Sequence, residues 1–82
     1  MYRICTEDIN RGAIQAILDS RVDGYSLFSG IGCWKGQREN SLAIDLIDVP
    51  REIVEKIAQV IKLENQQESV LILEVPVTAT FI

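Results

Sequence analysis

Two segments of the chain carry apolar residues at the three- and four-residue spacing of an amphipathic helix. In residues 9–20 the apolar positions are Ala13, Ile14, Ile17 and Leu18. In residues 51–64 they are Ile53, Ile57, Val60 and Ile61, with Val54 on the flank of the stripe. The second segment follows a Val-Pro pair, and proline is favoured in the first turn of a helix. The pattern therefore predicts two helices, each with one buried face.

Four further segments have the alternation or the short apolar runs typical of β-strands. They are residues 1–5, 25–31, 41–47 and 70–73, the last of which is apolar on both faces. Residues 77–82 follow Pro76 and are a candidate for an additional C-terminal edge strand. Without that strand, the predicted order of elements is βαββαβ.

This order predicts an α+β fold of the ferredoxin-like type, an open sandwich in which an antiparallel sheet carries both helices on one face. We expect a single domain, residues 1–82. The helical stripes account for one side of each strand and leave the other face of the sheet uncovered. Some of Tyr25, Phe28, Ala43 and Ile47 must lie on that face, together with either Leu71 and Leu73 or Val70 and Ile72. An exposed apolar sheet face implies a partner, and the simplest partner is a second copy of the chain.

The size of the chain favours the same expectation. A chain of 82 residues buries only about 60–65% of the surface that it exposes when unfolded, yet 48% of these residues are hydrophobic. The net charge of -4 and the pI of about 4.6 argue against binding to nucleic acid or to an anionic membrane. We find no signal-peptide pattern and no run of ~20 apolar residues, so we expect a cytoplasmic protein.

Residues 30–40 form the most unusual stretch of the chain. They combine three glycines, the only tryptophan and two basic residues. Because the stretch lies between two predicted strands, we expect it to be a loop and the main contact site of the protein. The candidate ligand-binding residues are Gly30, Gly32, Cys33, Trp34, Lys35, Gly36, Gln37 and Arg38.

The glycine spacing, G-x-G-x-x-x-G, differs from the dinucleotide fingerprint G-x-G-x-x-G. The stretch also leads into a strand, so no helix N-terminus is available to hold a phosphate. Backbone N–H groups could still converge on a small anion, with charge from Lys35 and Arg38. The alternative is a wide hairpin loop whose glycines serve its geometry alone. Trp34 has comparable alternatives: packing within or between subunits, stacking on a ligand, or anchoring a partner protein.

The remaining reactive side chains define no catalytic or metal site. The chain has no histidine, and its two cysteines, Cys5 and Cys33, are not in a Cys-x-x-Cys pair. We therefore expect two free thiols, no metal site and no cofactor. Glu39, Asp45 and Tyr25 are conceivable acid–base groups, but they form no recognisable catalytic arrangement in the sequence. We do not expect an enzyme.

Residues 30–37, GIGCWKGQ, resemble the G-x-G-x-x-K-G segment that follows the second strand in the PII-like superfamily of trimeric regulators. Residues 16–18 and 22–25 resemble the end of that family's first helix and the start of its second strand, so the likeness covers roughly the first half of the chain. The resemblance implies a βαββαβ fold and a homotrimer with ligand clefts between subunits. The positions that match the family's phosphate contacts are Gly32, Cys33 and Trp34.

The chain also departs from the PII-like pattern. Trp34 stands where the family has a polar residue that contacts phosphate. Residues 24–30 are shorter than the family's usual spacing, and only residues 36–40 stand in place of its long effector loop. Residues 75–82 contain no lysine or arginine, whereas family members hold phosphates with basic residues there. The resemblance therefore predicts the fold and the trimer, while the features that hold a nucleotide are largely missing.

Together these observations predict a small oligomeric protein of PII-like type that is regulatory or binds a ligand. Its clefts would lie between subunits near residues 30–38, and its partners would be other copies of itself, with a trimer favoured, and a small anionic ligand. One alternative is a protein–protein interaction module anchored by Trp34. The other is a small oligomeric enzyme.

Overall fold

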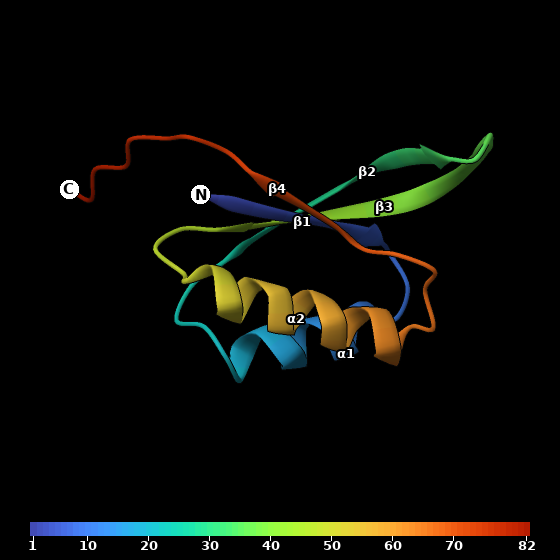
Figure 1. Ribbon diagram of the computed structural model, residues 1–82, viewed down its shortest axis with the longest axis horizontal. Helices are drawn as coiled ribbons and strands as arrows, with labels where there is room; N and C mark the ends of the chain where they lie inside the picture. Colours follow the sequence, from blue (N-terminus) through green and yellow to red (C-terminus); the bar gives the residue numbers. More distant parts are fainter.

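The computed structural model describes all 82 residues as one four-stranded antiparallel sheet with two helices packed on one of its faces (Figure 1). The elements are β1 (Tyr2–Glu7), α1 (Arg11–Asp19), β2 (Ser26–Trp34), β3 (Gln37–Leu46), α2 (Arg51–Glu64) and β4 (Leu71–Glu74). The strand order in the sheet is β2-β3-β1-β4, and every neighbouring pair is antiparallel. The α+β class, the antiparallel sheet and the two helices are confirmed, and the arrangement is consistent with a ferredoxin-like sandwich.

The core lies between the helices and one face of the sheet. Only 11 of the 82 residues are buried, so this core is small. Its apolar members are Ile4, Ile14, Leu18, Leu42, Ile44, Leu46, Val54, Ile57, Ala58 and Ile61. Most of the helical members belong to the predicted stripes, but Val54 is fully buried rather than on the flank, while Val60 is only half-buried. The one buried polar side chain, Thr6, is hydrogen-bonded to Gln67.

The sequence expectation of a loop over residues 30–40 is wrong. β2 continues to Trp34, β3 begins at Gln37, and these two residues pair across the hairpin. Only Lys35 and Gly36 connect the strands, with φ angles of 51° and 79°. Positive φ at both central residues is typical of the type I′ turn, whose twist matches that of the paired strands. We call residues 30–40 the hairpin arm, because Figure 1 shows this end of the hairpin projecting past the helices.

The additional C-terminal edge strand is also absent from the structure. The amide of Val75 donates to the carbonyl of Met1 at 2.8 Å and continues the β1–β4 pairing by one residue. Pro76 has no N–H to donate, and residues 75–82 have no regular secondary structure. We call residues 77–82 the tail. The tail and the hairpin arm project at opposite ends of the molecule and make its longest dimension 40 Å, against 23 and 20 Å for the others (Figure 1).

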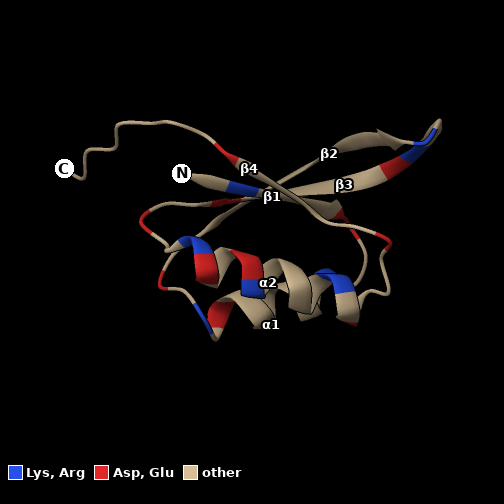
Figure 2. Ribbon diagram, in the orientation of Figure 1, with Lys and Arg blue, Asp and Glu red and all other residues tan.

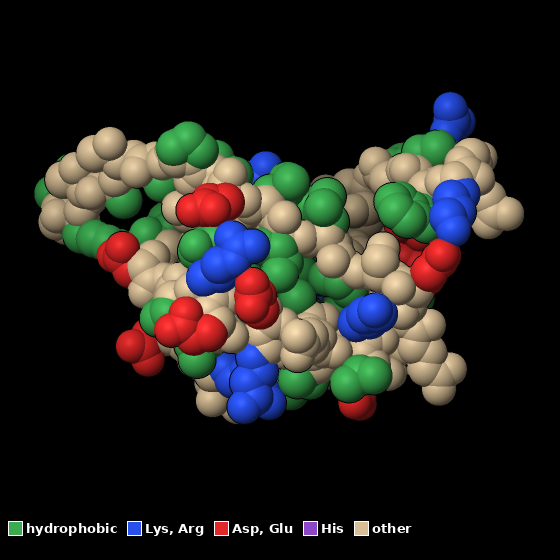
Figure 3. Space-filling view, viewed as in Figure 1, with side chains coloured by type: hydrophobic (Ala, Val, Ile, Leu, Met, Phe, Trp, Pro, Cys, Tyr) green, Lys and Arg blue, Asp and Glu red, His purple; other side chains and the backbone are tan.

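Charged side chains are unevenly distributed over the fold. Figure 2 shows them mainly on the helices, at the turn of the hairpin and in the connections, while β2 and the tail carry none. In the space-filling view of Figure 3, acidic and basic side chains alternate over the helices, and the tail stands away from the body of the molecule. Neither helix has the length and apolar character needed to cross a bilayer.

Candidate functional site

The hairpin arm separates the residues predicted to bind a ligand onto two faces. Leu27 is half-buried against the core and its cross-strand neighbour Ile44 is fully buried, so these two residues identify the side of β2 and β3 that faces the helices. By alternation, Cys33 and Arg38 lie on that side. The residues on the opposite side are Gly30, Gly32, Trp34 and Gln37, and Lys35 and Gly36 form the turn. The eight residues therefore do not converge on one point as a phosphate cradle would require.

Contacts at the turn also leave little free positive charge. The Nζ atom of Lys35 donates to Oε1 of Glu68 at 2.7 Å, and it lies 6.0 Å from the centre of the Trp34 ring. Arg38 takes part in no ion pair, so it is the one basic side chain of the arm available to an anion. Pairing of β2 with β3 occupies the backbone N–H groups that lie between these two strands. The unpaired N–H groups of the arm lie on the outer edge of β2 and on the other edge of residues 37–40, which β1 does not reach.

The three glycines of the arm differ in backbone conformation and in the space around them. Gly36 holds the positive φ of the turn. At Gly32 a Cβ atom would lie 3.4 Å from Cβ of Ser41 and 3.8 Å from Cγ of Glu39, which is ordinary contact. At Gly30 a Cβ atom would meet nothing within 4 Å. Nothing inside the subunit therefore requires glycine at position 30, and its absent side chain leaves open surface.

The main exposed feature is the face of the sheet that the helices do not cover, which we call the open face. One apolar residue from each strand lies in register across it: Phe28, Ala43, Cys5 and Leu71, which we call the apolar row. Both ends of the row are 54% exposed. Leu73 lies beside the row in β4, and Ile47 is exposed just beyond β3. Of the candidates for this face, Tyr25, Val70 and Ile72 pack against the core instead.

The molecule as a whole has more accessible surface than a compact monomer of its mass. The chain exposes 5696 Å², whereas a folded monomer of 9.2 kDa is expected to expose about 4,900 Å². The excess of about 800 Å² equals one partner's share of a standard protein–protein interface, roughly 800 Å². The open face, the hairpin arm and the tail carry most of the large exposed hydrophobic side chains: Phe28, Ile31, Trp34, Leu71, Leu73, Val77, Phe81 and Ile82.

Two carboxyl groups meet on the open face at the base of the arm. A side-chain hydrogen bond with Glu7 raises the pKa of Glu39, and desolvation and the negative charge of Glu7 act in the same direction. The sequence alone does not predict this contact, because Glu7 lies in β1 and Glu39 in β3, and the two strands are far apart along the chain. No group of three or more Cys, Asp or Glu side chains is arranged to hold a metal ion.

The conceivable acid–base residues do not form a catalytic group. Asp45 is held by two hydrogen bonds from Arg3. The hydroxyl of Tyr25 donates to Asp19 at 2.5 Å, and this bond raises the pKa of Tyr25. Glu39 lies six residues from Asp45 along β3, which is roughly 20 Å in a strand. The three side chains are therefore occupied separately or far apart.

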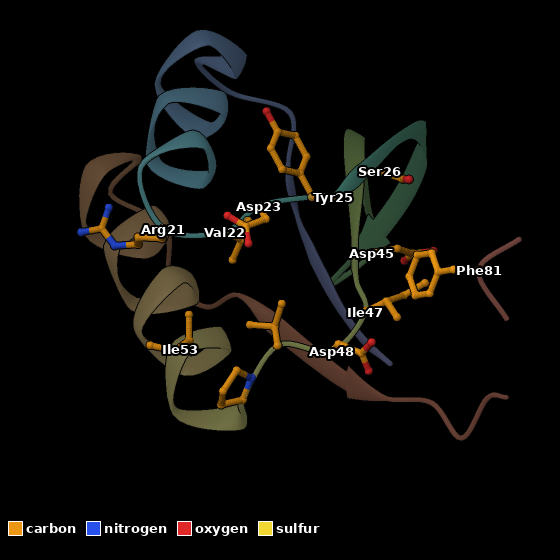
Figure 4. A pocket seen from close by; sticks show the side chains of 13 residues that line it. Arg21, Val22, Asp23, Tyr25, Ser26, Asp45, Ile47, Asp48, Ile53 and Phe81 are labelled. Carbon is orange, nitrogen blue, oxygen red and sulfur yellow. The ribbon is translucent and has the colours of Figure 1, made fainter. Parts of the chain in front are cut away.

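A cavity of about 670 Å³ lies at the other end of the hairpin, away from its turn (Figure 4). It is bordered by the connection from α1 to β2, the connection from β3 to α2, and the tail. Its polar side chains are Arg21, Tyr25, Ser26 and three carboxylates, Asp23, Asp45 and Asp48. Figure 4 shows the ring of Phe81 beside Ile47 and Asp45. The acidic lining disfavours an anion, and the sequence contained no motif that pointed to this cavity.

Both cysteines are free thiols. Cys5 lies in the apolar row, where burial raises its pKa although the charge of Arg3 opposes the shift. Cys33 lies on the opposite side of the hairpin arm and is exposed. The raised pKa of Cys5 is the opposite of the lowered pKa that a reactive cysteine requires.

Comparison with known proteins gives no family for this chain. It matches no protein-family model, and no characterised protein matches it at a significant level.

Proposed function

We propose that the protein is a small homo-oligomer, with a trimer favoured, built from ferredoxin-like βαββαβ subunits of PII-like type, and that it has a regulatory or ligand-binding role. The observation that carries the proposal is the apolar row on the open face. A helical layer covers the other face of the same sheet, so a second copy is the simplest cover for this one. The trimer itself comes from the resemblance to PII-like proteins.

The energetics support association through this face. Fully burying a Phe or Leu side chain contributes about 1.5–3 kcal/mol. Phe28 and Leu71 are each 54% exposed, so covering them would recover roughly 1 kcal/mol apiece. The residues between them, Ala43 and Cys5, are small and let a partner approach the sheet closely.

A ligand site near residues 30–38 would form only when subunits meet. Within one subunit the predicted ligand-binding residues lie on both faces of the arm. A neighbouring subunit beside the arm would close a cleft, with Arg38 as the available cation for a small anionic ligand. The acidic cavity at the far end of the hairpin is less suited to such a ligand.

Measurement of molecular mass in solution tests the proposal. Light scattering coupled to size-exclusion chromatography should show an oligomer at tens of micromolar, and Phe28→Ser should shift it toward the monomer. Leu63→Ser is the matched control, because Leu63 is 77% exposed on α2, away from the open face. A wild-type monomer at 100 µM would contradict the proposal. A thermal-shift screen of phosphate, nucleotides and other small anions on the same sample tests the ligand.

An interaction module anchored by Trp34 is the second candidate function. Its support is that Trp34 is 52% exposed at the last position of β2, beside the turn. If Trp34 anchors another protein, Trp34→Ala will leave the oligomer intact and abolish capture of that protein. If the substitution dissolves the oligomer instead, Trp34 belongs to the interface between copies.

A further inference from the structure

We propose that the tail of one copy adds as a strand to the outer edge of β2 in a second copy, where Phe81 packs over Gly30 and Gly32. The inference rests on the proposed self-association and adds an edge-to-edge contact between copies to the covering of the open face. Within one subunit neither the outer edge of β2 beside the glycine pair nor the apolar tail has a strand partner, and the inference makes each the partner of the other in a neighbouring copy.

β2 is an unprotected edge strand. It is the outermost strand of the sheet, so the backbone groups along its outer edge have no partner in the subunit. Proteins usually protect such edges with charged residues, proline or a bulge. The nine residues of β2, SLFSGIGCW, contain neither a charged residue nor proline, as Figure 2 shows. This edge is therefore open to pairing with another strand.

The tail has the composition of a strand without a strand partner. Its sequence, VTATFI, consists of β-branched and aromatic residues apart from one alanine, and it has no charge. Val77 is 50% exposed and Phe81 82% exposed. Although the ring of Phe81 lies beside Ile47 in Figure 4, most of its surface remains in water. A segment with this composition gains more from sheet pairing than from its present position.

The side-chain alternation of the tail matches the open face. Leu71 and Leu73 of β4 lie on that face. If the chain continues extended, Val77, Ala79 and Phe81 follow them there, because successive side chains alternate. The tail would thus extend the apolar surface of the open face toward the neighbouring sheet.

The outer strand offers a matching recess. On the open face β2 presents Phe28, Gly30, Gly32 and Trp34 in order, so two glycines separate two aromatic rings. From Phe28 to Trp34 is roughly 20 Å of strand, which is also the length of six extended residues. A Cβ atom at Gly30 would meet nothing within 4 Å, whereas one at Gly32 would make ordinary contact with Ser41 at 3.4 Å, so the recess is deepest at Gly30. An aromatic side chain laid over edge glycines stabilises a sheet by covering their backbone.

The topology directs the tail to another copy and toward a closed ring. The tail leaves from β4, and β4 and β2 are opposite edges of the sheet. Contact between different edges of two copies is head-to-tail, and such contacts close into rings when the rotation allows. Because strand directions alternate across the sheet, a copy placed alongside presents β2 antiparallel to β4 and to the tail.

The test removes the tail and then supplies it as a peptide. The variant lacking residues 77–82 should be monomeric under conditions in which the full chain is an oligomer. The probe is a synthetic peptide of residues 75–82, VPVTATFI, and the readout is emission of Trp34, the only tryptophan. We expect the peptide to bind the shortened chain and shift this emission to the blue. A Phe81→Ala peptide should bind at least tenfold more weakly, whereas an Ile82→Ala peptide should bind nearly as well.

The receiving edge is tested by filling the recess. Gly30→Leu in the shortened chain should weaken peptide binding at least tenfold, because the new side chain occupies the strip without meeting its own subunit. Gly12→Ala is the control, since Gly12 is also unobstructed but lies in α1. Circular dichroism establishes that the shortened chain is folded. If it is not, mass measurement on full-length Phe81→Ala decides, and an unchanged oligomer overturns the inference.

The outcomes separate this inference from the proposed function. If the shortened chain keeps the oligomer and does not bind the peptide, the tail-to-β2 pairing is wrong and self-association stands. If the full chain is a monomer at 100 µM and the peptide does not bind, both are wrong. If the full chain is a monomer but the shortened chain binds the peptide, β2 accepts a strand from its own tail or from another protein, and pairing between copies is overturned.

Discussion

Arg3 and Asp45 face each other across β1 and β3 and form a two-point ion pair on the open face. Nε and Nη2 of Arg3 donate to the two carboxylate oxygens at 2.6 and 2.9 Å. The pair lies one step from the apolar row, and the side chain of Asp45 is only 14% exposed. Because each charge is neutralised by the other in a fork geometry, a partner can cover this part of the face without burying an unpaired ion.

The ion pair gives a prediction about association. Arg3→Met or Asp45→Leu alone would leave one unpaired charge beneath the partner and should weaken self-association at least tenfold. The double variant removes both charges and should recover most of the affinity. Sedimentation equilibrium on the four proteins completes the double-mutant cycle. Equal dissociation constants for the wild type, the two single variants and the double variant would show that Arg3 and Asp45 lie outside the interface.

The turn of the hairpin arm gives a prediction about stability. Gly36 has a φ of 79°, so Gly36→Ala should lower the free energy of unfolding by about 1–2 kcal/mol. Lys35 has a φ of 51°, which asparagine tolerates better, and Asn-Gly is a preferred type I′ pair. Lys35→Asn should therefore raise the urea midpoint. Opposite signs for the two variants are the expected result, and a gain in stability from Gly36→Ala would contradict the turn geometry.

Gly12 lies inside α1 with open space around it. A Cβ atom there would meet nothing within 4 Å, and the backbone is helical. Gly12→Ala should raise the free energy of unfolding by about 1 kcal/mol, because glycine is the less favourable residue in a helix by that amount. Urea titration followed by circular dichroism measures the change. Gly24→Ala, outside any helix or strand, provides the comparison, and we expect a smaller gain there.

The contact of Glu39 with Glu7 gives a prediction about pH. Folding raises the pKa of Glu39 through its hydrogen bond with Glu7, so the folded state binds a proton at this carboxyl more tightly than the unfolded state does. The stability from this contact is present below the unfolded pKa and is lost as pH rises through the folded pKa. Glu39→Gln should thus raise the urea midpoint at pH 7 and reduce its fall between pH 4 and pH 7. Asp23→Asn controls for the loss of one negative charge elsewhere, because Asp23 is exposed and takes part in no ion pair. An equal effect of the two variants would discount the contact.

Sequence periodicity locates the helices and the core well, because burial against a single layer imposes a regular spacing. The spacing predicts that Ile14, Leu18, Ile57 and Ile61 face inward, and all four are buried. The pattern also predicts the open face, since Phe28 and the alternate leucines of β4 could not all face the helices. Tyr25 is misplaced among its candidates because position 25 precedes β2 and packs against the core.

The prediction for the hairpin arm is wrong because glycine has two structural meanings. Gly30 and Gly32 suggest a loop, but they occupy paired strand positions. The available signal is the Lys35-Gly36 pair between stretches of similar length, which a two-residue turn can join. Lysine is an uncommon residue at positive φ, so this signal is weaker than an Asn-Gly pair would be.

Local sequence by itself determined the two helices, their buried stripes, the strand-forming segments and the excess of apolar residues over the available core. These properties depend on spacing between near neighbours. Only the tertiary structure decided which strand-forming segments pair. Residues 30–34 found a partner in β3, whereas the tail, with an equally suitable composition, has none in the subunit. Strand pairing depends on which edge another segment can reach, and the chain topology sets that reach.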